Sequence, residues 1–330
     1  MGTLACLAAG FEIVARHPTL AAIPVLLDLF LWLGPRLSLA PIFQAMDRLM
    51  QEMLAVDTPI LQLKDASLLL GQVFTELEAR FNLFRALYPA PVLSVPSLMT
   101  ARMTVERPFG IRPDLVIASA PAALGWTIIL VILGLGLSAL YLRLIGQHVI
   151  DETDSPLPGP GAAIELWGRL VQFTLVLVAV LAFLFLGASF FLSFMVLVSM
   201  VIASLLMTVL FSTMLFVGLH LLFAVPGMVQ MRRTPMRAIQ ESVLLTRGDF
   251  LNVTILILLI LVISQGLNVV WLLPDPGRWT MLVGIVGHAF VNTALTVALF
   301  VFYQERLSFL KLLQQIYAAK EARVNSLISD

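Results

Sequence analysis

The chain has 330 residues, of which 60% are hydrophobic and 12% are charged, and its 20 basic and 20 acidic side chains balance. The charged share is about half of that in soluble domains and the apolar share is well above theirs, which excludes an ordinary soluble protein. Uncharged stretches long enough for a helix to cross a hydrocarbon core of about 30 Å recur along the chain. We therefore predict an all-α, polytopic integral membrane protein with about six transmembrane helices, interfacial amphipathic helices and an extracytoplasmic helical insertion.

Residues 1–39 are expected to form an interfacial helix followed by the first span. Apolar side chains recur at helical spacing in the first part, at Leu4, Leu7, Phe11 and Val14. The triplet Arg16-His17-Pro18 ends this pattern, and an apolar run from Leu20 to Leu33 follows. This run is of marginal length and contains Asp28, but we count it as a span because six spans give a consistent topology. The N-terminus lacks the basic start of a cleaved signal peptide, so we expect the first span to direct insertion.

Residues 40–114 form the predicted extracytoplasmic segment. A first amphipathic helix is indicated by the apolar positions Met46, Leu49, Met50, Met53 and Leu54. A second has an apolar stripe from Ala66 to Tyr88, and five prolines between Pro89 and Pro113 then favour an extended linker. We expect the two helices to pack on each other and on the ends of the spans. The alternative is that the methionine-rich face within residues 44–88 binds a protein partner or the outer leaflet.

Residues 115–304 contain the predicted spans two to six. Runs with no charge, or with one histidine, mark three of them, at Leu115–Leu142, Phe250–Leu273 and Trp279–Gln304. Residues 170–231 carry no charge apart from His220, and this stretch is too long for one span. We expect two spans that turn at Gly187-Ala188-Ser189, and three short spans are the alternative.

Positively charged loops predict the orientation, because short cytoplasmic loops are enriched in Lys and Arg. An inner-face basic group precedes the fifth span and consists of Arg232, Arg233, Arg237 and Arg247. We therefore place this linker, the N-terminus and an amphipathic tail of residues 305–330 on the cytoplasmic side. Residues 40–114 fall on the outer side. The expected location is the cytoplasmic membrane of a cell, with a multi-pass topology.

A short interfacial helix over residues 234–247 is predicted to lead into the fifth span. Thr234 suits the N-cap and Pro235 suits the first helical position. Gly248 is expected in the left-handed conformation that ends a helix, and Asp249 as the N-cap of the next one. We favour this structural role of the Arg-Gly-Asp triplet over an adhesion motif, because the triplet lies on the predicted cytoplasmic face.

Two stretches carry a resemblance to a known family, FEIVARHPTLAAIPVLLDLFLWL in residues 11–33 and AIQESVLLTRGDFLNVTILILLILVI in residues 238–263. They resemble the interfacial-helix and span pattern of the multi-spanning membrane domain associated with some bacterial glycerophosphodiester phosphodiesterases, and of related integral membrane families. In those proteins the phosphodiesterase activity resides in a separate soluble barrel, for which this chain has no room. The resemblance implies a fold class and no active site, and residues 40–114 depart from the family pattern.

Enzyme motifs are absent from the sequence, which has no Gly-x-Ser-x-Gly elbow, phosphate-binding glycine loop or His-Glu-x-x-His helix. We expect no enzymatic activity, no cofactor and no metal. The acidic group Asp151, Glu152 and Asp154 is interpreted as a solvated loop, since it lacks the spacing of a calcium loop. Polar side chains also recur on one helix face, at Ser204, Thr208, Ser212 and His220. For these we favour packing or backbone bonding over a ligand site.

The candidate site is an intramembrane polar cluster that joins spans one, five and six. It consists of Asp28, Gln265, Asn268, His288 and Asn292. On the predicted topology, the depths of these residues in their spans agree to within roughly 6 Å, at about 1.5 Å of rise per residue. We expect an ionic contact between Asp28 and His288, with the amide side chains completing the hydrogen bonds. Interhelical bonding without a ligand is favoured, a proton or ligand site is the second interpretation, and no contact is the third.

We predict a non-enzymatic polytopic membrane protein, with lipid handling or membership of a membrane complex as its role. The alternative is a proton- or cation-coupled transporter that uses the polar cluster, and a membrane enzyme comes third. Membrane lipids are the expected partners, and nucleic acid is not expected. The ligand and the oligomeric state stay open.

Overall fold

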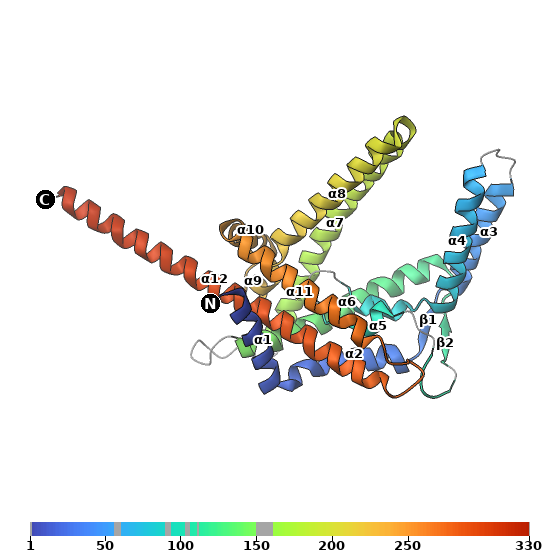
Figure 1. The fold of residues 1–330 in the computed structure, drawn as a ribbon, viewed down its shortest axis with the longest axis horizontal. Helices are drawn as coiled ribbons and strands as arrows, with labels where there is room; N and C mark the ends of the chain where they lie inside the picture. The colour runs from blue at the N-terminus through green and yellow to red at the C-terminus, as the bar shows by residue number, and fades with distance from the viewer. Residues whose placement is uncertain are drawn as a thin grey trace. The chain divides into compact units, whose positions relative to one another are not determined.

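The structure is a computed structural model that describes residues 2–55, 61–89, 94–102, 106–110, 112–149 and 161–329, with side chains described outside 53–69, 197 and 310–329. Within these ranges, five helices are long and apolar enough to cross a membrane. They are α6 (Ala120–Val149), α7 (Gly161–Val198), α8 (Met200–Leu221), α11 (Phe250–Trp271) and α12 (Met281–Ser329) (Figure 1). A sixth span results if the bent pair Thr3–Arg16 and Pro18–Leu33 counts as one. The prediction of an all-α, polytopic membrane protein is confirmed.

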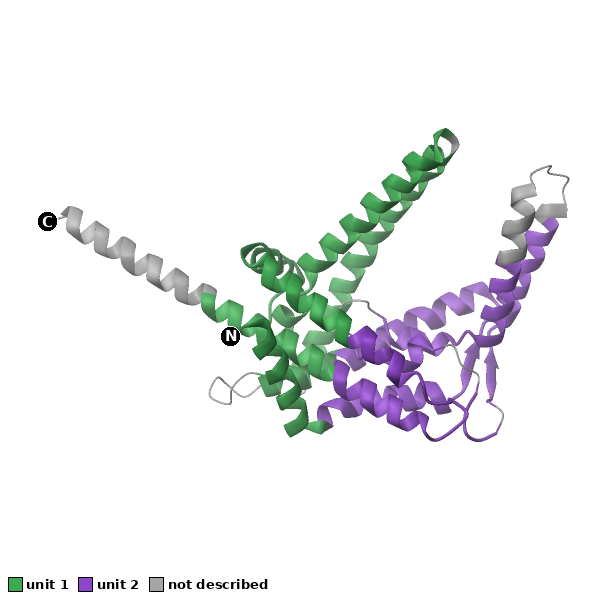
Figure 2. Ribbon diagram, viewed as in Figure 1, with its two compact units in different colours: residues 1–18, 139–263, 293–330 green, residues 19–138, 264–292 purple. Residues whose placement is uncertain are grey.

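The chain divides into two compact units, each made of separate segments (Figure 2). Unit 1 contains residues 1–18, 139–263 and 293–330, and unit 2 contains residues 19–138 and 264–292. The boundaries fall inside α6, α11 and α12, so each of these helices contributes one part to each unit. These units are spatial groupings, whereas the predicted division after residues 39, 114 and 304 follows the sequence.

In unit 1, helix α1 (Thr3–Arg16) packs closely against α12. The contact is made by Gly10, where a Cβ atom would lie 2.4 Å from the carbonyl oxygen of Ala294. Glycine is required here because any side chain would overlap with the backbone of α12. Leu7 and Val14 of the predicted apolar stripe are buried, whereas Leu4 is exposed. The N-terminal helix therefore buries one face against a membrane helix.

The stretch that was expected to form two spans forms α7 and α8, followed by the short helix α9 (Ala224–Gln230). The two long helices meet at Ser199, so the predicted turn at Gly187-Ala188-Ser189 is wrong, because those residues lie inside α7. In apolar surroundings every backbone polar group needs a partner, and a helix therefore continues through glycine and serine. Within α7, the hydroxyl of Ser193 also donates to the carbonyl oxygen of Ser189 (2.8 Å).

The hydroxyl side chains of α8 bond to the backbone of their own helix. Ser204, Thr208 and Ser212 donate to carbonyl oxygens three or four residues earlier, at 2.8 to 3.0 Å. His220 Nδ1 lies 2.8 Å from the carbonyl oxygen of Phe216. This arrangement agrees with the backbone bonding that we favoured over a ligand site.

Helix α10 (Pro235–Gly248) begins as predicted, after an extended Thr234 and with Pro235 in its first turn. Its end differs from the prediction. In the described chain Gly110 is the one glycine with a positive φ, so Gly248 is not left-handed. The helix ends instead through Asp249, with φ −144° and ψ 47°, and this turn needs no left-handed residue.

The aspartate of the Arg-Gly-Asp triplet is engaged inside the protein. Asp249 pairs with Arg306 of α12 (2.8 Å) and accepts a hydrogen bond from Asn252 Nδ2 (2.7 Å). Its own carbonyl oxygen accepts from the backbone N–H of Val253 (3.1 Å) in the first turn of α11. These contacts support the structural role that we favoured for the triplet.

Unit 2 contains the second half of the broken first span. Residues Pro18–Ala21 form the 3₁₀ turn η1, and α2 (Ala22–Leu33) follows with 12 residues. At about 1.5 Å per residue, α2 alone is too short to cross a core of about 30 Å. The break has a local cause, because Pro18 lacks the N–H that would continue α1.

Two short strands that the sequence analysis did not predict lie in unit 2. The strand β1 (Arg36–Ser38) pairs in parallel with β2 (Asp114–Val116), with Arg36 opposite Asp114. Because Leu115 and Val116 belong to β2, the second membrane helix begins at Ala120 and not at Leu115.

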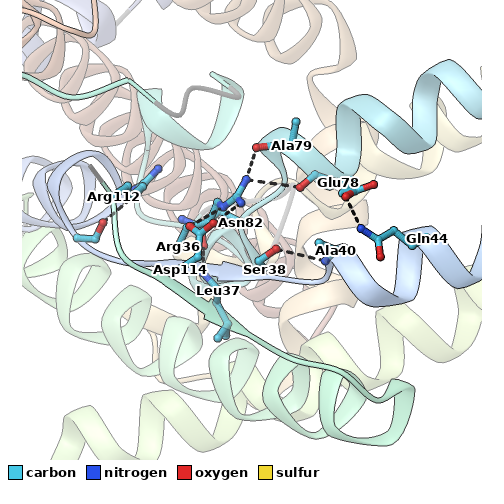
Figure 3. A network of polar contacts seen from close by, with 11 residues as sticks. Arg36, Leu37, Ser38, Ala40, Gln44, Glu78, Ala79, Asn82, Arg112 and Asp114 are labelled. Atoms are coloured by element: carbon cyan, nitrogen blue, oxygen red, sulfur yellow. Dashed lines mark hydrogen bonds and ion pairs between the residues drawn. The ribbon is translucent and has the colours of Figure 1, made fainter. Parts of the chain in front are cut away.

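The strand pair is bonded to the end of helix α4 (Leu61–Arg80) (Figure 3). The guanidinium of Arg36 pairs with the carboxylate of Asp114 and donates to the carbonyl oxygen of Ala79. Asn82 Oδ1 accepts from the backbone N–H groups of Leu37 (3.0 Å) and Phe84 (3.1 Å). Asn82 thereby caps η2 (Leu83–Leu87), and the predicted stripe to Tyr88 belongs to two elements.

Helix α3 (Ala40–Ala55) and α4 pack against each other, as expected (Figure 1). Gln44 Nε2 donates to Glu78 Oε1 (2.5 Å), and the rings of Phe43 and Phe81 meet edge to face with centroids 5.6 Å apart. Met46, on the predicted methionine-rich face, is exposed. The side chains of Met53, Leu54 and Ala66 lie outside the described ones.

Candidate functional site

Three arginines of the linker before β2 bond to backbone carbonyl groups at the C-terminal ends of α2 and α11. Arg107 donates to the carbonyl oxygen of Leu33 (3.1 Å), and Arg112 donates to those of Leu31 and Gly34 (2.9 Å for Gly34). The last carbonyl groups of a helix have no partner within it and carry a partial negative charge, so guanidinium groups are favourable there. Burial lowers the pKa of Arg112.

The third arginine acts at the end of α11. Arg102 donates to the carbonyl oxygens of Leu272 (3.0 Å) and Pro274 (2.9 Å). The predicted extended linker is therefore held against the helix ends, and it contains a one-turn helix, α5 (Leu98–Ala101).

Asp28 of α2 is fully buried and binds the first turn of α5. Its carboxylate accepts from the hydroxyl of Ser97 (2.5 Å) and from the backbone N–H groups of Leu98 (2.9 Å) and Met99 (3.0 Å). The structure thus gives Asp28 partners in the linker, in place of the ionic contact with His288 that we expected. A buried carboxylate needs such donors, and the linker supplies all three.

The other four predicted cluster residues line one cavity of about 490 Å³ in unit 2. Its wall from α11 consists of Ser264, Gln265 and Asn268, and its wall from α12 consists of His288 and Asn292. The remaining wall comes from the linker and η2, namely Arg85, Tyr88, Pro96, Ser97, Thr100 and Ala101. Measured along α11 and α12 at about 1.5 Å per residue, the polar residues lie roughly 5 to 16 Å from the helix ends at Trp271 and Met281.

Two polar atoms at this cavity are buried and have no hydrogen-bond partner among the described residues. They are Nδ1 of His288, whose side chain is 7% exposed, and Oδ1 of Asn268. Asn292 is differently placed, since it accepts from Ser264 Oγ (2.6 Å) and donates to the carbonyl oxygen of His288 (3.1 Å). Unsatisfied buried groups cost about 1 to 3 kcal/mol each, so a side-chain rotation that brings either atom to an occupant of the cavity would be favourable.

Arg85 brings positive charge to the cavity wall. Within the described chain its guanidinium has no carboxylate partner, and burial lowers its pKa. It also lines a small neighbouring cavity together with Arg80, Arg102 and Arg112. Sequence reasoning missed Arg85, because it is a single cation among apolar residues and belongs to no motif.

No family model, curated protein or solved structure matches this chain.

The inner-face basic group lies in unit 1 and does not form one site. Arg233 pairs with Glu241 (2.8 Å), whereas the other three are exposed, namely Arg232, Arg237 and Arg247. Exposed arginines on α10 (Arg237 and Arg247) and just before it (Arg232) suit contact with anionic headgroups, worth about 1 kcal/mol per charge.

Metal ligands do not gather in the described residues, which contain no group of three or more His, Cys, Asp or Glu side chains. The acidic group Asp151, Glu152 and Asp154 lies outside the described ranges. Cys6 is buried as a free thiol and donates to Glu305 Oε2 (3.3 Å).

Proposed function

We propose that this chain is a non-enzymatic membrane protein that handles lipids, and that the cavity of unit 2 holds a polar headgroup. The observation that carries the proposal is the position of the cavity wall on α11. Gln265 lines the cavity and is itself exposed, and Val269, one turn further along the helix, is 66% exposed. Polar cavity and apolar outer surface thus meet on one helix face, which suits a ligand with a polar head and an apolar tail.

The size of the cavity supports the same ligand class. A volume of about 490 Å³ falls within the range of about 300 to 1,000 Å³ that is typical of sites for small organic ligands.

Occlusion of the cavity tests this function. Ala101 is exposed and lines the cavity, so Ala101→Trp places a large ring in the ligand space. We expect native mass spectrometry of the protein purified with its lipids to show a bound lipid in the wild type and a clear loss of it in this variant. Ala45→Trp, at an exposed alanine of α3, is the matched control and should retain the lipid. Equal lipid occupancy in all three proteins would contradict the proposal.

A proton- or cation-coupled transporter is the second candidate, favoured by the buried, unsatisfied Nδ1 of His288 inside α12. Proteoliposomes that carry the wild type or His288→Gln distinguish the two functions. A wild-type proton flux that the substitution abolishes would favour transport, and absence of flux in both proteins would favour lipid handling.

A further inference from the structure

Resting on the proposed lipid function, we propose that the ligand of this cavity carries a phosphate group and that Arg85 binds it. The charges of the site are the first argument. Among the described residues that line the cavity, none is a carboxylate, and Arg85 is the one with a permanent charge. A cationic headgroup or a metal ion would therefore meet no counter-charge, whereas an anion would.

The surroundings of Arg85 strengthen the attraction for an anion. Arg80, Arg102 and Arg112 lie with Arg85 around the small neighbouring cavity of about 10 Å³, which has room for at most about one water molecule. Of the nearby carboxylates, Asp114 is paired with Arg36, and Asp28 is bonded to the first turn of α5. Among the described residues around this small cavity there are four arginines and no carboxylate, so this side of unit 2 favours anions.

The geometry of the Arg85 guanidinium suits a phosphate group. Arg presents parallel N–H donors that match two oxygens of a phosphate, and such charge-assisted pairs are about twice as strong as neutral hydrogen bonds. The hydroxyl group of Tyr88 lines the same wall and can donate to a further oxygen, whereas those of Ser97 and Thr100 already donate to Asp28 and to the carbonyl oxygen of Ser97.

The opposite wall suits the uncharged remainder of a headgroup. Asn268 and His288 line this wall, and the polar atoms that they bury without partners can bond to a hydroxyl or an amine once the side chain rotates toward the cavity. Phosphate at Arg85 and a small polar substituent at the α11 and α12 wall together describe a phospholipid headgroup. Inorganic phosphate would satisfy the Arg85 wall alone.

Thermal stabilisation of the full chain in detergent tests the proposal, because a ligand of the folded state raises Tm with its concentration. The probes are short-chain phosphatidylglycerol, the matching diacylglycerol without phosphate, and inorganic phosphate. The variants are Arg85→Gln, Arg85→Lys and the control Arg48→Gln, at an exposed arginine of α3. Each variant is compared with its own Tm without ligand, so a change in basal stability does not enter the comparison.

We expect phosphatidylglycerol to raise the Tm of the wild type and of Arg48→Gln, and diacylglycerol to have little effect. Arg85→Gln should need at least about tenfold more lipid for the same rise, with Arg85→Lys in between. An equal response to diacylglycerol, or an unchanged response in Arg85→Gln, would overturn the phosphate proposal and leave lipid handling standing. Stabilisation by inorganic phosphate without any by lipid would support the phosphate site and refute the lipid function. No stabilisation by any probe would overturn both.

Discussion

Removal of the Asp28 carboxylate should loosen the linker from α2 and lower the stability of unit 2. Asp28→Ala leaves the buried backbone N–H groups of Leu98 and Met99 without acceptors, and each costs about 1 to 3 kcal/mol. The sum is about 2 to 6 kcal/mol. Asp28→Asn retains one carbonyl oxygen and turns an N–H group toward one donor, so about half of this loss is expected.

Ser97→Ala is the complementary change from the other side of the contact. It removes one hydroxyl that donates to Asp28 and accepts from the backbone N–H of Thr100 (3.2 Å). Loss of a cap of this kind costs about 0.5 to 2 kcal/mol. The expected order of destabilisation is therefore Asp28→Ala, then Asp28→Asn, then Ser97→Ala.

Thermal unfolding of the purified variants, followed by tryptophan fluorescence, measures this order. Trp32, one of five tryptophans, lies on α2 and is 1% exposed, so the loss of packing around this helix contributes to the change in emission. Glu52→Gln, at an exposed carboxylate of α3, is the control and should leave Tm unchanged. A Tm of Asp28→Ala equal to that of the wild type, or above that of Ser97→Ala, would refute the assignment of Asp28 to the linker.

Three further predictions concern topology and packing. The first uses single cysteines at two exposed positions, Ala45→Cys and Met236→Cys, in a background without Cys6. They should react with an impermeant thiol reagent from opposite sides of the membrane. Labelling of both from one side would contradict the proposed orientation. Gly10→Ala should lower Tm by the equivalent of about 1 to 3 kcal/mol, because its Cβ would overlap with α12. Gly168→Ala is the control and should leave Tm unchanged, since the space around Gly168 is open. Equal Tm values for the two variants would disprove the close packing of α1. Glutamine is placed at three exposed arginines together, Arg232, Arg237 and Arg247. A protease-protection assay should then show a fraction of inverted or poorly inserted chains. A uniform orientation would exclude a role of these arginines in setting the topology.

Membrane helices were predictable from the sequence because their signal is local. The charge-free runs locate α6, α11 and the apolar part of α12, and the pair Thr234-Pro235 locates the start of α10. The turn at Ser199 was not predictable from residue type, since glycine and serine continue a helix when no water competes for its backbone.

Long-range pairs explain most of what the sequence did not indicate. Arg36 and Asp114 lie 78 residues apart, and neither the strand pair nor its cap by Asn82 has a local signature. In the candidate site, helical depth along α11 and α12 was enough to group Gln265, Asn268, His288 and Asn292. The linker wall was missed, because the path by which a proline-containing segment returns to the spans depends on contacts such as that of Asp28.

The packing of α1 on α12 has a consequence for biosynthesis. Cys6 and its hydrogen-bond partner Glu305 are separated by 299 residues. At a synthesis rate of about 5 to 20 residues per second, Glu305 is made roughly 15 to 60 s after Cys6. During that interval the face of α1 that contains Cys6, Leu7 and Val14 lacks its partner in α12. The insertion machinery or lipid must shield it, and α12, which is made long after α1, then completes its packing.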